Sequence, residues 1–205
     1  MKNWKYILLA LILFPFAGMV SSCSEDSGEE GEYDDWQNRN DVVTAEWAGS
    51  SMKKIICYSK NTTISGNVAD YIYVEVLESG TGIETPLFTD TCRLAYRGRL
   101  IPSKSYPEGY VFDQSYLGDF NWNTIDVARD ENGRDKVCLD QDFVPGFTTA
   151  LMNMHIGDRW RVYIPYQLGY GSLAKPTCSY SNLIFDVALV DFWHPGEHRP
   201  VFKSR

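Results

Sequence analysis

The chain has 205 residues, 44% of them hydrophobic and 14% aromatic, which is enough apolar material to bury one core of ordinary size and leave room for extensions. The formal net charge of −8 at pH 7 provides no basic stripe for nucleic acid or anionic lipid. The composition therefore predicts one domain of catalytic size that has no nucleic-acid partner.

The amino terminus has the pattern of a targeting segment. Lys2 and Lys5 precede an apolar run over residues 6–20, and the small residues Ser21 and Ser22 stand directly before Cys23. The run of about 15 residues is shorter than the roughly 20 that a membrane-spanning helix needs. We therefore expect this segment to direct export rather than to cross a membrane.

The same pattern resembles a bacterial lipoprotein signal, in which residues 1–22 are removed and Cys23 becomes the lipidated first residue of the mature protein. A simple secretory peptide cleaved nearby is the alternative. Each buried acyl methylene contributes about 0.8 kcal/mol to membrane binding. The resemblance thus implies a protein of the Gram-negative cell envelope, held by its lipid anchor alone on the periplasmic or the outer-surface face of the outer membrane.

An acidic tether is expected over residues 23–35. The stretch SEDSGEEGEYDD carries seven acidic residues and little hydrophobicity, a composition that cannot bury enough surface to fold. One interpretation is that its charge merely keeps the segment extended. The other is that acidic residues directly after the lipidated cysteine resemble the export signals of some surface lipoproteins. Both interpretations leave the membrane leaflet open.

Four cysteines follow Cys23. An even number in an exported chain permits disulfides, and we expect at most one bridge. No spacing among them indicates a metal site, and none is predicted. The four are Cys57, Cys92, Cys138 and Cys178.

Residues 36–70 form an extension ahead of the main domain. Their apolar residues are spaced only loosely as in one helix, and Gly49-Ser50-Ser51 interrupts the pattern. A helical hairpin and a single helix packed on the domain both remain open, and the segment could also mediate dimerisation. Residues 61–70 have the composition of a turn or loop.

Period-two alternation begins at Tyr71 and recurs three times. Apolar residues alternate with polar ones over residues 71–78, 91–99, 159–164 and 183–192, and turn residues follow the first run. Four half-buried strands with one convincing helix predict an α+β fold, in which the helix packs on one side of an antiparallel sheet.

The helix is expected over residues 146–154. Phe147, Leu151 and Met154 form one apolar stripe, and Thr148 and Thr149 lie away from it. Pro145 suits the first turn, and Gly157 suits a left-handed stop. Because barely three turns are marginal alone in water, the concave face of the sheet must hold this helix.

An ordered series of motifs carries a family resemblance. The series reads LAYRGRL at residues 94–100, VFDQS at 111–115, FVPGF at 143–147, GDRW at 157–160, Tyr170-Gly171, and LIFDV at 183–187. In this order the motifs resemble the FKBP-type peptidyl-prolyl cis/trans isomerases. The resemblance covers roughly residues 71–193 and leaves a tail at 194–205.

The resemblance implies a twisted antiparallel sheet wrapped around the short helix, with a hydrophobic pocket between them. The residues that it implies for catalysis are Tyr96, Phe112, Asp113, Val144, Phe147, Tyr170 and Phe185. It further implies substrate contacts at Phe120, Phe143, Trp160 and Leu183. Phe147 would form the floor, and the Tyr170 hydroxyl and the Val144 N–H would donate hydrogen bonds to bound carbonyls.

Such a site needs no nucleophile, metal or cofactor. Rotation about an amide costs about 18–20 kcal/mol, and the X-Pro bond is the one whose cis and trans forms lie close in energy. An apolar pocket that removes water favours the less dipolar, twisted amide, and placed donors bind that twisted state. No histidine is assigned a catalytic role.

Some residues depart from the family pattern. Phe147 stands where many members have tryptophan, residues 123–142 are longer than the usual connection, and residues 172–182 are short. The main hypothesis is an isomerase that assists the folding of exported proteins, with prolyl-containing polypeptides as clients and macrolides as inhibitors. The others are a chaperone that binds prolyl segments with little turnover, and a structural lipoprotein.

Overall fold

A computed structural model describes residues 31–60, 66–123 and 143–198, which belong to one compact unit, residues 31–205. The predicted signal peptide, Cys23, most of the acidic tether, Cys138 and most of the long connection at 123–142 lie outside the described residues. Across the described ranges, no helix is both long and apolar enough to cross a membrane.

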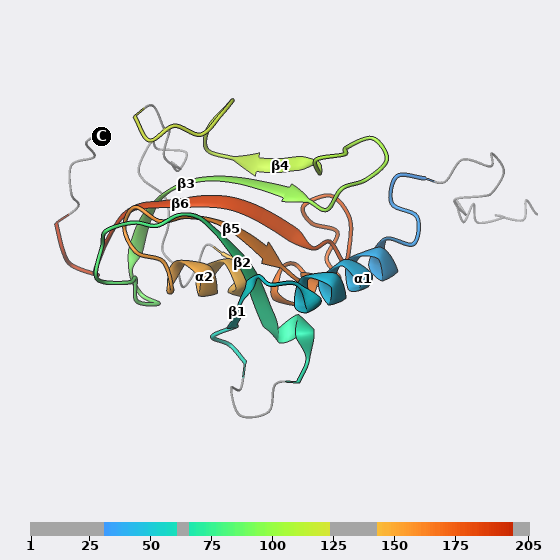
Figure 1. Cartoon of the computed structure of the whole chain (residues 1–205), viewed down its shortest axis with the longest axis horizontal. Coiled ribbons are helices and arrows are strands. Elements are labelled where there is room, and N and C mark those ends of the chain that lie inside the picture. Colours follow the sequence, from blue (N-terminus) through green and yellow to red (C-terminus); the bar gives the residue numbers. More distant parts are fainter. Residues whose placement is uncertain (1–30, 61–65, 124–142, 199–205) are drawn as a thin grey trace, which may run out of the picture. The chain divides into compact units, whose positions relative to one another are not determined.

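The core of the fold is a six-stranded antiparallel sheet (Figure 1). Its strands lie in the order β1-β2-β5-β6-β3-β4. Their bounds are β1 Lys53–Ile56, β2 Tyr71–Glu78, β3 Thr91–Leu100, β4 Val111–Gln114, β5 Arg159–Ile164 and β6 Leu183–Trp193. The four strands expected from alternation are β2, β3, β5 and β6. The structure adds β1 and β4 at the two edges, where short, largely exposed strands leave no alternation to recognise.

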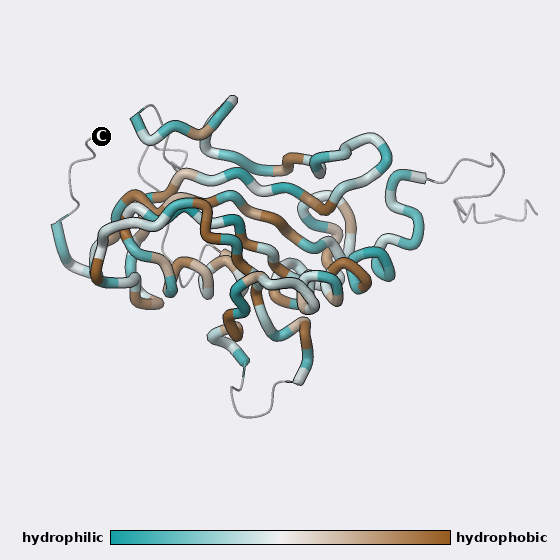
Figure 2. The backbone as a smooth tube through the Cα atoms, in the orientation of Figure 1, coloured by the Kyte–Doolittle hydropathy of each residue, from teal (hydrophilic) through white to brown (hydrophobic). Residues whose placement is uncertain are grey.

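The inner face of the sheet is the face covered by the short helix α2, Pro145–Leu151. Gly146 lets this helix lie directly on β5, because a Cβ there would collide with the Ile164 side chain. The predicted antiparallel sheet with a short helix packed on one side is confirmed. Apolar residues concentrate in the middle of the sheet, and the connection that carries β4 is more hydrophilic (Figure 2).

The expected end of α2 was wrong in detail. The helix ends at Leu151 rather than at Met154, because the last turn tightens to i−3 bonds from Asn153 N to Ala150 O (3.0 Å) and from Met154 N to Leu151 O (3.1 Å). Thr149 is buried, although it lies off the apolar stripe. Its hydroxyl donates to Pro145 O (2.8 Å) and accepts the Tyr58 N–H (3.2 Å). The segment after β1 therefore covers the polar side of the helix.

In the described part of the amino-terminal extension, one α-helix, α1 (Trp36–Gly49), is followed by strand β1 rather than by a second helix of a hairpin. The buried residues of α1 are Trp36, Asn40, Thr44 and Trp47. Two of the four are polar, which explains why an apolar pattern was hard to recognise in the sequence. The helix packs across the connection between β5 and β6, where the Trp36 indole N–H donates to Ser181 Oγ (2.9 Å).

Asn182 joins α1 to the sheet through fully satisfied buried hydrogen bonds. Its amide nitrogen donates to Asn40 O (2.8 Å) and to Thr44 Oγ1 (3.0 Å), and its backbone N–H donates to Asn40 Oδ1 (2.7 Å). Its Oδ1 accepts the Tyr166 N–H (2.8 Å). This network fixes α1 just before β6 begins.

The cysteines that the structure describes lie in three different segments: Cys57 directly follows β1, Cys92 lies in β3, and Cys178 lies between β5 and β6. Cys57 and Cys178 have free thiols, and Cys92 is fully buried in β3. The described residues contain no cluster of His, Cys, Asp or Glu that could hold a metal ion.

Candidate functional site

Five aromatic rings converge where α2 meets the inner face of the sheet. Phe147 of α2 is at the centre, with its ring centroid 4.4 Å from that of Phe143, 4.6 Å from Phe185 of β6 and 6.1 Å from Tyr96 of β3. Phe112 of β4 lies 5.6 Å from Phe185, edge to face. We call these five residues the aromatic site. Residues far apart in the sequence thus form one continuous apolar surface.

A glycine makes this convergence possible. Gly98 lies opposite Phe185 in the β3–β6 register. A Cβ at Gly98 would lie 2.6 Å from Phe185 Cε1 and 2.7 Å from Phe112 Cζ. Isolated glycine inside a strand marks close approach of another group, and here the group is the pair of aromatic rings.

Tyr96 and Asp113 form the polar rim of the site. The Tyr96 hydroxyl donates to Asp113 Oδ2 over 2.7 Å. Burial raises the pKa of Tyr96, and the hydrogen bond to Asp113 raises it further. Burial likewise raises the pKa of Tyr170, with a smaller contribution from the charge of Asp113. Both phenols therefore remain protonated at neutral pH and can act as donors.

Two donors beside the aromatic site are unused. Within the described part of the chain, neither the Tyr170 hydroxyl nor the Val144 backbone N–H has a hydrogen-bond partner. Val144 is the residue that caps α2, and both residues are half-buried. The site thus combines an apolar surface with two donors free to bind carbonyl oxygens.

The floor expected at Phe147 is closed. Phe147 is 0% exposed, and the Phe143 ring lies against it. The surface that a ligand would meet is offered by the half-buried residues Tyr96, Phe112, Phe143 and Tyr170. Phe185, with 5% exposure, supports these rings from below.

Two of the residues assigned to substrate contact lie in the core. Leu183 is 0% exposed in β6, and Trp160 is 3% exposed in β5. The Trp160 indole N–H has no hydrogen-bond partner among the described residues, and Lys53 Nζ lies 4.9 Å from the centre of its ring. Both side chains face inward and support the sheet.

Phe120 lies apart from the aromatic site, contrary to the expectation. Its ring packs 5.6 Å from Tyr116 and 5.0 Å from Trp122, and Arg159 lies over it at 4.4 Å. These contacts belong to the other face of the sheet, where the small residues Ala95 and Ala188 stand opposite each other and leave space. The segment after β4 therefore folds over the outer face, a direction that alternation in the sequence does not encode.

Comparison with known proteins places this geometry in context. The model of the family described as FKBP-type peptidyl-prolyl cis-trans isomerase matches residues 83–190. A protein of Trypanosoma cruzi named macrophage infectivity potentiator is 34% identical over 125 residues, which are 58% of this chain and 52% of the relative. The FKBP-type 22 kDa peptidyl-prolyl cis-trans isomerase of Escherichia coli is 32% identical over 133 residues, covering 64% and 52%.

Solved structures agree with the fold. The crystal structure of FkpA from Escherichia coli superposes with a TM-score of 0.51 at 26% identity, over 78% of this chain and 62% of that chain. The chain spans about half the length of the curated relatives that it matches. Both α1 and β2 lie outside the residues that the family model matches.

Proposed function

Because the chain belongs to the FKBP-type peptidyl-prolyl cis-trans isomerase family, we propose that it catalyses rotation about X-Pro bonds at the aromatic site. The observation that carries the proposal is the convergence of five rings beside the unused Tyr170 and Val144 donors. An X-Pro amide that lies against the rings is removed from contact with water. Its twisted form, which is less dipolar, is then favoured over the planar form.

The donors supply the selectivity for the twisted state. A prolyl segment that accepts hydrogen bonds from Tyr170 and Val144 on either side of the amide is held in a bent conformation. Each factor of ten in rate requires only about 1.4 kcal/mol of additional transition-state binding. The bond between Tyr96 and Asp113 keeps the Tyr96 ring in place at the rim. Val144 takes part through its backbone, and the remaining residues take part through their side chains.

We further propose where the protein works. The amino-terminal pattern of residues 1–22 and Cys23 supports a lipid-anchored protein of the Gram-negative envelope. Its clients would be exported polypeptides that contain proline, and macrolides would compete for the same aromatic surface.

The test is an isomerisation assay on short peptides with varied residues before proline, using residues 24–205, which contain the whole compact unit. Tyr170→Phe should lower the rate roughly 3- to 10-fold, since one neutral hydrogen bond is lost. Tyr58→Phe is the matched control, because its ring packs on Phe88 away from the aromatic site, and its rate should equal that of the unmodified chain. If none of these proteins isomerises the peptides faster than buffer alone, the proposed isomerase activity is refuted.

The covered floor favours a second candidate, a module that binds prolyl segments without turnover. Phe143 lies against Phe147 and leaves it no exposed surface, so a proline ring would contact the rim rather than the floor. Calorimetry on the same peptides separates the candidates. Measurable binding with no acceleration supports the module, and binding with acceleration supports the isomerase.

A further inference from the structure

A second concave site lies on the outer face of the sheet, opposite α2. Because side chains alternate between the faces of a strand, Arg97 and Arg99 point away from the aromatic site formed by their neighbours. The site is a groove of about 590 Å³, a volume typical of ligand-binding clefts. Its walls are α1 and the connection from β3 to β4, and its floor is the outer face; we call it the outer groove. Its floor residues are Arg99, Arg161, Tyr163 and Ile184.

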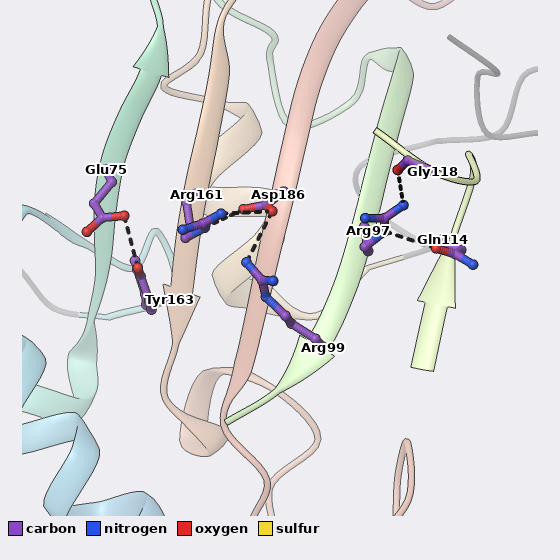
Figure 3. A network of polar contacts seen from close by, with 8 residues as sticks. All are labelled: Glu75, Arg97, Arg99, Gln114, Gly118, Arg161, Tyr163 and Asp186. Atoms are coloured by element: carbon purple, nitrogen blue, oxygen red, sulfur yellow. Dashed lines mark hydrogen bonds and ion pairs between the residues drawn. The ribbon is translucent and has the colours of Figure 1, made fainter. Parts of the chain in front are cut away.

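The floor combines two arginines with the Asp186 carboxylate, and Glu75 accepts the Tyr163 hydroxyl beside them (3.0 Å). Arg161 binds Asp186 through Nε (2.6 Å) and Nη2 (3.2 Å), and Arg99 Nη2 binds the same carboxylate at 3.2 Å (Figure 3). Arg97, the next arginine along β3, pairs with Gln114 and the Gly118 carbonyl instead. Two guanidinium groups, those of Arg99 and Arg161, therefore share the Asp186 carboxylate.

Arg99 keeps unused hydrogen-bond donors at the floor of the groove. Arg99 uses one of its five N–H donors for Asp186 and no other is bonded to a described residue. The side chains of Arg99 and Arg161 are 17% and 32% exposed. A carboxylate entering the groove would find charge-assisted donors already held in position by Asp186.

Apolar side chains line the groove beside these arginines. Trp47 of α1 packs 5.2 Å from the ring of Tyr163, and Ile101 and Ile184 complete this surface. Val42, on the α1 wall, is 50% exposed. An aliphatic side chain next to the carboxylate would bury this surface from water.

Charges of both signs line the groove above the floor, because Arg39 of α1 lies there as well as two glutamates. Glu46 of α1 and Glu108 of the β3–β4 connection line the opening, are exposed, and form no ion pair with any described residue. A uniformly acidic ligand would be repelled there. The rim instead suits a ligand that places a basic group outward while its acidic group reaches the floor.

We propose that the outer groove binds a polypeptide segment in which an acidic side chain, flanked by aliphatic and basic residues, contacts Arg99 and Arg161. The segment's aliphatic side chain packs on Trp47 and Tyr163, and its basic residue meets Glu46 or Glu108. The groove is separate from the aromatic site, and its partner segment need not contain proline. The protein thus has a second contact surface for polypeptides.

The experiment is a peptide titration of the protein comprising residues 24–205, with isotope labels on its methyl groups and arginine side chains. Nuclear magnetic resonance follows the shifts of the labelled signals. The probe is the blocked peptide Gly-Lys-Leu-Asp-Leu-Lys-Gly, compared with a peptide in which asparagine replaces aspartate. The aspartate peptide should shift the methyl signals of Val42, Val43 and Ile184. The asparagine peptide should bind roughly tenfold more weakly, because a hydrogen bond to a charged group is lost. Equal affinity for the two peptides would overturn the proposal.

Paired variants distinguish the groove from general effects on the sheet. Arg99→Gln should weaken the aspartate peptide roughly tenfold, whereas Arg97→Gln, on the same strand and face but outside the groove, should bind normally. Val42→Glu, at an exposed helix position, should also weaken binding. Equal losses in Arg99→Gln and Arg97→Gln would contradict the assignment.

Two further outcomes would also overturn it. Free aspartate that shifts the same signals with the affinity of the peptide would indicate a small-anion site. Sedimentation that shows a dimer abolished by Val42→Glu would indicate that a second copy of the chain covers the groove. Rotation of a short prolyl peptide should remain unchanged in all three variants, so failure here leaves the isomerase proposal standing.

Discussion

The inner and outer faces of the sheet are made by alternate residues of the same strands, yet they differ in almost every physical respect. On β3, Tyr96 and Gly98 contribute to an apolar site closed by aromatic rings, and Arg97 and Arg99 contribute to a charged surface. The aromatic site on the inner face requires the space that Gly98 leaves for two rings. The charge pairs on the outer face require that the strands pair in this register.

The register of the outer face sets opposite charges beside each other. Reading across five strands, Glu75, Arg161, Asp186, Arg97 and Gln114 stand directly opposite their neighbours. A shift of one residue would exchange the two faces and put arginine among the aromatic rings. The register that places the aromatic rings on the inner face therefore also places the charges on the outer face. Substitutions on one face test whether the function of the other face is affected.

The largest effect should come from releasing α1, which forms one wall of the outer groove. Asn182→Ala leaves buried polar groups of Asn40, Thr44 and Tyr166 without their partner. Each unsatisfied group costs about 1–3 kcal/mol, so we expect a loss of roughly 3–5 kcal/mol in the free energy of unfolding. Urea denaturation measures it. Ser50→Ala, at the far end of the helix, is the control and should lose less than half as much.

The next effect should be confined to the inner face. Gly98→Ala pushes a methyl group into Phe185 and Phe112, which should lower the free energy of unfolding by about 1–3 kcal/mol. It should also lower isomerisation by at least tenfold, because both rings must move. Gly49→Ala, whose added Cβ meets nothing within 4 Å, should do neither. A Gly98→Ala protein with full activity would show that the ring positions are not critical.

A smaller effect is expected from the charge on the outer face. Asp186→Asn keeps the shape and removes the carboxylate shared by Arg99 and Arg161. Since both guanidinium groups are partly exposed, we expect a loss of about 1–2 kcal/mol that diminishes at high salt. Isomerisation of a short peptide should be unchanged at a temperature where the variant is folded. A drop in activity comparable to that of Gly98→Ala would mean that the faces are coupled through β6.

Sequence reasoning predicted the strands that have one buried face, because burial on one side forces the alternation that it detects. The strand expected at residues 159–164 coincides with Arg159–Ile164 in the structure. It could not detect the buried side of α1, since Asn40 and Thr44 are polar and their partner Asn182 is about 140 residues away. Periodicity describes only local patterns, and this network depends on contact at long range.

The aromatic site shows the same division. The ordered motifs brought Tyr96, Phe112, Phe147 and Phe185 together in the prediction, and the structure places these four rings in one cluster. Phe120 was misplaced because the direction of the chain after β4 depends on the space beside Ala95 and Ala188. The covering of Phe147 by Phe143 was also missed, since it depends on how a side chain just before α2 packs against the helix.

The smallest predicted effect acts where β3 begins and β6 ends, and it should affect the aromatic site and the outer groove equally. His194, just after β6, bonds through Nδ1 to the buried Asp90 at 2.7 Å. This hydrogen bond raises the pKa of His194 above its usual 6.5. Because the pKa is higher in the folded state, the stabilisation is present below about pH 6.5 and is lost as the pH rises through the folded pKa.

Urea midpoints at pH 6 and pH 9 measure this contribution in the unmodified chain and in His194→Gln. The decrease in the urea midpoint from pH 6 to pH 9 should be larger in the unmodified chain than in His194→Gln, by a small but resolvable amount. Since β3 begins next to Asp90 and β6 ends next to His194, both sites share this anchor. Peptide rotation at the aromatic site and peptide binding in the outer groove should therefore change in parallel in His194→Gln. A change at only one site would show that the two faces are anchored separately.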